Sequence, residues 1–136
     1  MWASLINLSS ELQFRVPFAD IDIGKVVYHA RYFHYLDQGR TEWFRTYNIS
    51  LAEMMTLHDT ALIVCRTEAD YRAPARFDDF LTLRTTLSQQ RQARFLFTQD
   101  ILHGSRLLVH AHVHLATVSV SSLKPVKPPR RVLSPE

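Results

Sequence analysis

The stretch ARYFHYLDQGRTEWFRTY, residues 30–47, decides how this chain folds. Its large side chains recur at intervals of three and four residues, which is the spacing of an amphipathic helix. The positions with this spacing are Phe33, Leu36, Arg40, Trp43, Phe44 and Tyr47. No proline interrupts the run, and Gly39 is the only helix-weakening residue within it. A small residue inside a buried helix lets a sheet approach closely, so we expect other structure to cover most of this helix.

Segments with strand patterns lie on both sides of the helix. Before it, residues 12–18 alternate in polarity, and Pro17 indicates an edge position or the end of the strand. After it, residues 51–57 are predicted to form a short second helix, with Ser50 and Glu53 as its capping box. Further strands are predicted over residues 60–71, 80–90, 94–103 and 106–121. Strands joined by short turns pair antiparallel, so the sequence predicts an α+β fold in which one antiparallel sheet wraps around a long central helix.

Length and composition fit a single globular domain over residues 1–136. Hydrophobic residues make up 46% of the chain and charged residues 21%, a balance that argues against a disordered protein. The single cysteine, Cys65, excludes a disulfide framework, and its apolar neighbours predict a buried, inert thiol. The N-terminus has no signal-peptide pattern and no segment has the length of a membrane span, so we expect a cytoplasmic protein.

The segment FADIDIGKVVYHA, residues 18–30, carries the candidate chemistry. Its order places a carboxylate in a tight turn, close to the positive end of the predicted helix. Such a site can hold a negative charge and polarise a carbonyl group, as acyl-transfer chemistry requires. Because Asp20 and Asp22 lie two residues apart in an extended stretch, we expect their side chains to point in opposite directions. Asp20 is then interpreted as an acceptor that stabilises the turn.

Other side chains near this segment leave alternatives open. The imidazole of His29 is a candidate acid, a contact for the leaving group, or an orienting residue. Glu42, on the predicted helix, is a rival base. Tyr28 is expected to pack against neighbouring structure.

The alternating histidines His110, His112 and His114 should share one face of a strand. The outer pair would be about 13 Å apart on a straight strand, too far for one metal ion to take all three. We therefore predict no metal site. These histidines are expected on a half-polar sheet face, where they could make subunit assembly depend on pH.

Three further motifs accompany the Asp-x-Asp-x-Gly-x-Val-Val-Tyr-His run: RTE at residues 40–42, YRAPARFDD at residues 71–79 and LKP at residues 123–125. In this order and spacing, the chain resembles the hotdog-fold acyl-CoA thioesterases of the 4-hydroxybenzoyl-CoA thioesterase type. It looks most like the small bacterial thioesterases encoded beside the Tol–Pal envelope system. The resemblance covers most of the chain. It implies hydrolysis of an acyl-CoA thioester to free acid and CoA, with no metal and no cofactor.

The resemblance also implies roles for individual residues. Asp22 would be the nucleophile or general base, and the backbone N–H of His29 would donate to the thioester oxygen. Lys25 departs from the family, in which a glycine or another small or apolar residue is common at this position. Its ammonium group could act on Asp22, reach a CoA phosphate or point into solvent. Family members are dimers, often paired into tetramers, so a homo-oligomer with its active site between subunits is expected.

Binding of CoA requires cations for the phosphates. The candidate substrate-binding residues are Lys25, Tyr28, Arg76, Arg91 and Arg94, and Lys124 and Lys127 lie in a basic C-terminal segment of about residues 122–136. The last six residues of that segment are expected to be solvated. The alternative function is a non-catalytic hotdog module that binds acyl-CoA or acyl carrier protein. Nucleic-acid binding is disfavoured, because the aromatic residues lie mostly on the predicted helix rather than among Lys and Arg on a strand face.

Overall fold

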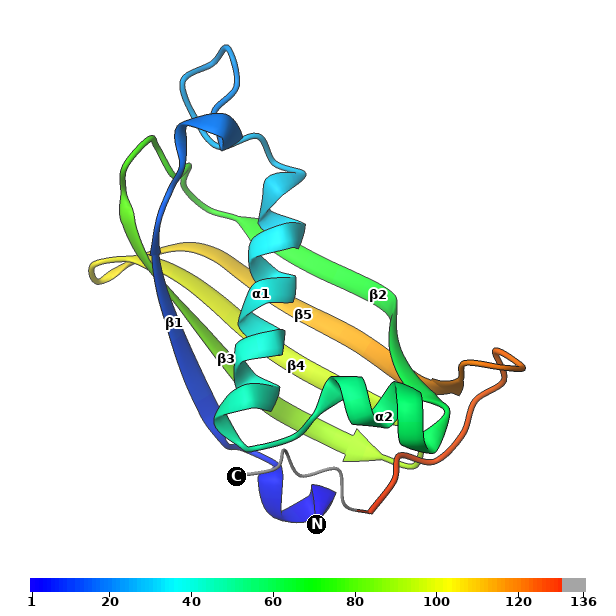
Figure 1. The fold of residues 1–136 in the computed structure, drawn as a ribbon. Coiled ribbons are helices and arrows are strands. Elements are labelled where there is room, and N and C mark those ends of the chain that lie inside the picture. The colour runs from blue at the N-terminus through cyan, green and yellow to red at the C-terminus, as the bar shows by residue number, and fades with distance from the viewer. Residues whose placement is uncertain (131–136) are drawn as a thin grey trace.

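The computed structural model describes residues 1–130 and has the predicted α+β architecture (Figure 1). One antiparallel sheet of five strands, in the order β1-β3-β4-β5-β2, curves around the long helix α1. The helical segments are η1 (Trp2–Leu5), η2 (Phe18–Asp20), α1 (Arg31–Thr46) and α2 (Leu51–His58), of which η1 and η2 are 3₁₀ turns. The strands are β1 (Ser9–Arg15), β2 (Thr60–Tyr71), β3 (Phe80–Arg91), β4 (Arg94–His103) and β5 (Arg106–Ser119).

The core lies between α1 and the concave face of the sheet. Along β3, β4 and β5, buried residues alternate with more exposed ones, as expected for an antiparallel sheet with one covered face. Trp43 and Phe44 of α1 pack edge to face on Phe97 of β4, with ring centroids 5.1 and 5.7 Å away. The aromatic residues of the helical stretch therefore join α1 to the middle of the sheet.

Gly39 marks the closest approach of α1 to the sheet. A Cβ atom at this position would lie 2.5 Å from Leu83 Cδ2 and 2.9 Å from Thr85 Oγ1, both on β3. These separations are shorter than real side chains tolerate. The prediction that a small residue here permits close packing of the sheet is confirmed.

The strand that follows α2, β2, does not pair with β3, the next strand in the sequence. Residues 72–79 carry the chain across the sheet, so β2 pairs with β5, whereas β3 pairs with β1 and β4. β1 and β2 are therefore the two edges. β1 ends at Arg15, before Pro17, and is an edge strand, although it begins and ends three residues earlier than residues 12–18.

The second helix has the Ser50 half of the predicted capping box. The Ser50 hydroxyl accepts a hydrogen bond from the Glu53 N–H at 3.1 Å, and α2 runs to His58. Asp59 ends α2 in a left-handed conformation. Within the described residues, no helix has the length and apolar character needed to cross a membrane.

One expectation about burial is wrong. Cys65 is exposed, because it lies on edge strand β2 at an irregularity in the pairing between Val64 and Arg66. Of the residues with helical spacing, Phe33 is 48% exposed and lines the groove between α1 and β2.

The segment after β5 returns along the end of the sheet. The Val126 N–H donates to Thr117 O at 3.0 Å, and Trp2 Nε1–H donates to Pro129 O at 2.7 Å. Much of the predicted basic segment is thus attached to the fold through its backbone. Residues 131–136, for which a solvated tail is expected, lie outside the described residues.

Candidate active site

The motif loop, residues 21–30, joins η2 to α1 and forms a tight turn around Asp22 (Figure 1). The Asp22 N–H donates to Val26 O and the Lys25 N–H donates to Asp22 O, both at 3.0 Å. A third hydrogen bond of the turn involves the Asp22 side chain, whose Oδ1 accepts from the Gly24 N–H at 2.8 Å. Within residues 1–130, Oδ2 has no hydrogen-bond partner, and the side chain is half-buried. One carboxylate oxygen therefore fixes the turn while the other remains available.

Lys25 occupies the left-handed position of this turn, with φ at 66°. A residue in this conformation commonly closes a three-residue turn, and glycine is favoured there because it has no Cβ. A side chain in this region costs about 1–2 kcal/mol. Lys25 thus has an exposed side chain at a strained backbone position.

Backbone hydrogen bonds attach the motif loop to its surroundings. The Val27 N–H donates to Ala75 O at 2.9 Å, and the Tyr28 N–H donates to Asp20 O at 3.0 Å. The Tyr32 hydroxyl of α1 accepts from the Ala75 N–H at 3.0 Å. The YRAPARFDD motif therefore supports the loop through Ala75.

The first turn of α1 presents open backbone donors. The Arg31 N–H donates to Tyr28 O and the Tyr32 N–H donates to His29 O, at 2.9 and 3.2 Å. Ala30, the N-cap residue, provides no side-chain cap. In the described part of the chain, the N–H groups of His29 and Ala30 have no acceptor. They lie at the positive end of the helix dipole, where an oxyanion is stabilised.

The side chains of Tyr28 and His29 lie at the surface. Their rings contact each other with centroids 4.6 Å apart. Tyr28 is 49% exposed, so the expectation that it packs against neighbouring structure is met in part. His29 also lines a cavity of about 300 Å³, together with Val27, Tyr32 and Tyr71.

Asp20 is an acceptor, as expected, but its side chain bonds to α1 rather than to the turn. The Tyr35 hydroxyl donates to Oδ2 at 2.5 Å, and Arg31 Nε lies 3.4 Å from Oδ1. Burial, followed by the hydrogen bond with Asp20, raises the pKa of Tyr35. The two aspartates of the motif therefore have different partners, since the Asp20 carboxylate contacts side chains of α1 and the Asp22 carboxylate accepts from a backbone N–H within the turn.

The rival base Glu42 lies away from the motif loop. It forms an ion pair with Arg45 at 2.5 Å. It follows Arg31 by eleven residues on α1, which is about 16 Å along a helix. Within one subunit, the structure does not bring Glu42 to Asp22.

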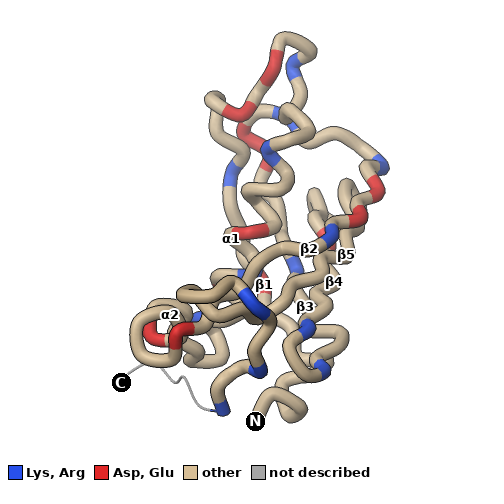
Figure 2. The backbone as a smooth tube through the Cα atoms, turned by 90° about the vertical axis from the view of Figure 1, so that its right-hand side faces the viewer, with Lys and Arg blue, Asp and Glu red and all other residues tan. Residues whose placement is uncertain are grey.

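The predicted cations fall into two groups. Lys25 and Arg76 lie near the motif loop, since Arg76 follows Ala75 directly. Arg91 and Arg94 lie on either side of the turn of the β3–β4 hairpin, where Ala93 O accepts from the Thr117 N–H of β5. Lys and Arg positions are visible at this end of the molecule, near the termini (Figure 2). One subunit therefore does not gather all of these cations.

The histidines of β5 lie on the face of the sheet turned away from α1. Their neighbours Ala111 and Val113 are buried on the other face. His110 pairs with Asp100 at 2.5 Å, His112 lies 3.3 Å from Thr98 Oγ1, and His114 lies 3.6 Å from Glu68. The expected half-polar face is present. The described residues contain no cluster of three or more His, Cys, Asp or Glu that could hold a metal ion.

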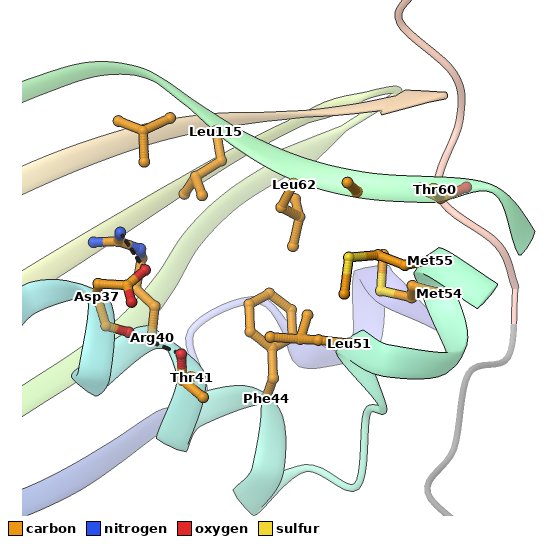
Figure 3. A pocket seen from close by; sticks show the side chains of 12 residues that line it. Asp37, Arg40, Thr41, Phe44, Leu51, Met54, Met55, Thr60, Leu62 and Leu115 are labelled. Atoms are coloured by element: carbon orange, nitrogen blue, oxygen red, sulfur yellow. Dashed lines mark hydrogen bonds and ion pairs between the residues drawn. The ribbon is translucent and has the colours of Figure 1, made fainter. Parts of the chain in front are cut away.

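Cavities follow the groove between α1 and β2. Beyond the cavity at His29, a second of about 320 Å³ is lined by Phe33, Leu36 and Val113. A third, of about 240 Å³, lies between α1, α2 and β2 and is lined mostly by apolar side chains, among them Phe44, Leu51, Met54, Leu62 and Leu115 (Figure 3). The second and third share Asp37, Arg40 and Val64. Each is near or below the low end of the roughly 300–1,000 Å³ of ligand pockets, so a larger ligand would need more than one.

Arg40 is a buried cation beside this groove that the helical spacing did not distinguish from a core residue. It is 6% exposed, and Nη1–H donates to Gln99 Oε1 at 3.0 Å. Burial lowers its pKa, and Asp37 opposes this effect. Gln99 in turn donates to Leu36 O and Thr85 Oγ1, both at 2.9 Å. An arginine at a buried helical position was the available signal, but its partner lies 59 residues away in the sequence.

Comparisons with a family model and with named relatives both identify thioesterases. The model of the Thioesterase-like superfamily matches residues 16–135. The acyl-CoA thioesterase YbgC of Haemophilus influenzae is 36% identical over 118 residues, which are 87% of each chain. The acyl-CoA thioester hydrolase YbgC of an Escherichia coli O6:H1 strain is 33% identical over 121 residues, 88% of this chain and 90% of the relative.

Solved structures agree with this relationship. A probable thioesterase from Bartonella henselae superposes with a TM-score of 0.80 at 35% identity, covering 90% of this chain and all of the other. A 4-hydroxybenzoyl-CoA thioesterase in complex with 4-hydroxybenzoyl-CoA has a TM-score of 0.82 at 18% identity, covering 90% and 94% of the two chains, and shares the fold. The chain therefore belongs to the Thioesterase-like superfamily and has its hotdog fold.

Proposed function

We propose that this protein hydrolyses acyl-CoA thioesters to a free acid and CoA. Relatives named acyl-CoA thioesterase or thioester hydrolase, 33–36% identical over most of the chain, support the reaction class. The observation that carries the proposal is that the loop just before α1 holds both the Asp22 carboxylate and the His29 N–H, which has no acceptor within the described residues.

The His29 N–H serves as the oxyanion donor in this proposal. The thioester carbonyl oxygen accepts its hydrogen bond, and the dipole of α1 favours the negative charge that develops on that oxygen. A single donor of this kind is worth about 3–4 kcal/mol of the barrier. Because the donor is a backbone group, the role depends on the loop conformation rather than on the imidazole.

Asp22 supplies the attacking group by one of two routes. As a nucleophile, its free oxygen attacks the carbonyl carbon, the C–S bond breaks, and CoA leaves as a thiolate. Water then cleaves the resulting anhydride. As a general base, Asp22 takes a proton from a water molecule as its oxygen attacks the same carbon. The C–S bond of the resulting tetrahedral intermediate then breaks, and the departing CoA thiolate takes up the proton. Both routes consume one water and give the acid and the CoA thiol.

Further residues contribute to substrate binding in this proposal. Tyr28, Lys25 and Arg76 lie near the motif loop and contact the CoA arm or its phosphates. Arg91 and Arg94 are assigned to the CoA phosphates as well, and their distance from the loop within one subunit requires that a second subunit present them. The acyl group extends into the groove between α1 and β2, whose walls are mainly apolar.

The site is proposed to be completed in a homo-oligomer. Edge strand β2 offers unpaired backbone groups on one side, and its residues Ile63 and Val64 are 45% and 50% exposed. Exposed apolar side chains on an unpaired edge are a surface that a second copy of the chain can cover. The cytoplasmic location remains a prediction from the sequence.

The decisive first assay separates an enzyme from a binding module. The purified protein is mixed with a series of straight-chain and aromatic acyl-CoAs, and released thiol is measured over many equivalents. We expect multiple turnovers with at least one substrate. If acyl-CoA bound the protein and stayed intact throughout the series, the chain would instead be a non-catalytic acyl-CoA-binding module.

A further inference from the structure

We propose that Tyr35 is a positioning residue of this active site, which acts through Asp20 to hold the motif loop in register with the first turn of α1. The inference rests on the proposed function, because the groups that Tyr35 positions are the Asp22 carboxylate and the His29 N–H. Neither Tyr35 nor Asp20 touches the substrate in this role.

The Tyr35 side chain is itself rigidly held. It is 2% exposed, and its ring lies between Phe14 of β1 and Tyr32 of α1, with centroid distances of 4.8 and 5.9 Å. The hydroxyl donates to Asp20 Oδ2 at 2.5 Å. Since burial and Asp20 raise the pKa of Tyr35, the hydroxyl keeps its proton and remains a donor. A fixed donor on α1 therefore determines where Asp20 lies.

Asp20 transmits that position to both reacting groups. Its carbonyl oxygen accepts the Tyr28 N–H at 3.0 Å, and Tyr28 directly precedes His29. Asp22 follows Asp20 by two residues, and Ile21 between them forms a β-bridge with Val27. A displacement of Asp20 would consequently move the Asp22 carboxylate and the His29 N–H together.

The other anchors of the loop do not replace this one. Ala75 accepts from the Val27 N–H and donates to the Tyr32 hydroxyl, and neither of these bonds is made to Asp20. Arg31 also approaches Asp20, at 3.4 Å, but its side chain is 51% exposed, and exposed ion pairs are weak and screened by salt. Within the described residues, the Tyr35 hydroxyl is thus the buried side-chain anchor of Asp20.

The test compares two variants that each remove one hydroxyl from α1 or its C-cap. Tyr35→Phe keeps the packed ring and removes only the donor to Asp20. Tyr47→Phe is the matched control, because the Tyr47 hydroxyl donates to Ser9 O, at the opposite end of the helix. We measure kcat and KM on an acyl-CoA that the wild type hydrolyses, and the melting temperature of each variant.

Tyr35→Phe should lower kcat by roughly 10- to 100-fold, the range expected when reacting groups are misplaced, with little change in KM. Tyr47→Phe should keep wild-type kcat while losing a similar amount of thermal stability. On an Asp20→Ala background, which removes the acceptor of the Tyr35 hydroxyl, Tyr35→Phe should add little further loss, because both changes break the same hydrogen bond. Equal kcat values for Tyr35→Phe and Tyr47→Phe would refute the positioning role.

Backbone hydrogen exchange provides a readout that needs no substrate. In Tyr35→Phe, the Tyr28 and Lys25 amides should exchange faster, while the Ile49 amide, which donates to Phe44 O, should be unchanged. Unchanged protection at Tyr28 would overturn the inference even if the protein hydrolysed no thioester. Failure of the proposed function, in contrast, would appear as an inactive wild type whose loop still loosens in Tyr35→Phe.

Discussion

Lys25 combines a proposed role in binding CoA with a strained backbone conformation. Its φ of 66° is a conformation that glycine adopts without cost. We predict that Lys25→Gly raises the free energy of unfolding by about 1 kcal/mol, measured by urea denaturation. Lys25→Ala keeps the strain and serves as the control. If Lys25 contacts a CoA phosphate, both variants should raise KM to the same extent, whereas an unchanged KM in both would remove Lys25 from the binding site.

At the residue scale, features that depend on a short stretch of sequence were predicted better than contacts between residues distant in the sequence. The turn around Asp22 and the open N–H groups at the start of the helix follow from a short stretch, whose turn residues and helix start are visible in the sequence. The choice of the His29 N–H among these groups was implied by the family resemblance. The bonds from Tyr35 to Asp20 and from Arg40 to Gln99 were not predicted, since they depend on how α1 sits on the sheet and the loop. A half-exposed Tyr28 and an exposed Cys65 were missed for the same reason: exposure depends on the neighbours that folding supplies.

At the element scale, Gly39 sets the distance between α1 and the sheet. Gly39→Ala would place a methyl group 2.5 Å from Leu83, which is fully buried and has little room to move. Overpacking of this kind costs about 1–3 kcal/mol. Over most of that range the cost exceeds the gain in helix propensity from glycine to alanine, which is roughly 1 kcal/mol. We therefore expect a lower free energy of unfolding in urea. Gln38→Ala, at the exposed neighbouring position, is the control, and a Gly39→Ala variant as stable as Gln38→Ala would contradict the close contact.

Asp59 connects the end of α2 to the end of β5. Its carboxylate accepts from the Ser119 and Ser121 hydroxyls and the Ser121 N–H, and these hydrogen bonds lower its pKa below the ordinary 3.8. The folded protein thus binds this proton more weakly than the unfolded chain. The resulting stabilisation is fully present above that ordinary value and is lost as the pH falls through the lower folded pKa.

The corresponding variant is Asp59→Asn, since asparagine tolerates the left-handed backbone. It should be less stable than the wild type at neutral pH, and the difference should shrink as the pH falls below about 4. Thermal melts across this pH range provide the measurement. Asp78→Asn, another aspartate with positive φ, is the control. A difference between Asp59→Asn and wild type that stayed constant down to the lowest pH would argue against the predicted linkage.

The element types and the single antiparallel sheet around α1 followed from the sequence, but the order of the strands in that sheet did not. The helical stretch and the strands over residues 60–71 and 94–103 were predicted with the observed bounds or within one residue of them. The first strand was misplaced by three residues, because polar Ser9 and Ser10 give no alternation signal and yet pair with Thr86 and Thr85. The position of β2 at the far edge was not predicted either, since it depends on how residues 72–79 cross the sheet.

At the scale of the whole molecule, the unpaired edge of β2 is the proposed contact between subunits. A charged residue on an edge strand discourages pairing with another strand. Ile63→Lys should therefore shift the protein toward the monomer in sedimentation velocity at a fixed concentration. Gln13→Lys adds the same charge to the β1 edge and should leave assembly unchanged. If Ile63→Lys kept the wild-type sedimentation coefficient, the oligomer would have to form through another surface.

The central claim assigns the chemistry to Asp22 and is tested most directly by the turnover of Asp22→Asn. The change keeps the shape of the side chain and an oxygen that can accept from the Gly24 N–H, but removes the charge needed for attack or for taking a proton from water. Glu42→Gln, at the rival carboxylate, is the matched control. With an acyl-CoA that the wild type hydrolyses, we predict a loss of kcat of at least roughly 100-fold in Asp22→Asn and near wild-type kcat in Glu42→Gln. Wild-type kcat in Asp22→Asn, or a comparable loss in Glu42→Gln, would contradict the assignment.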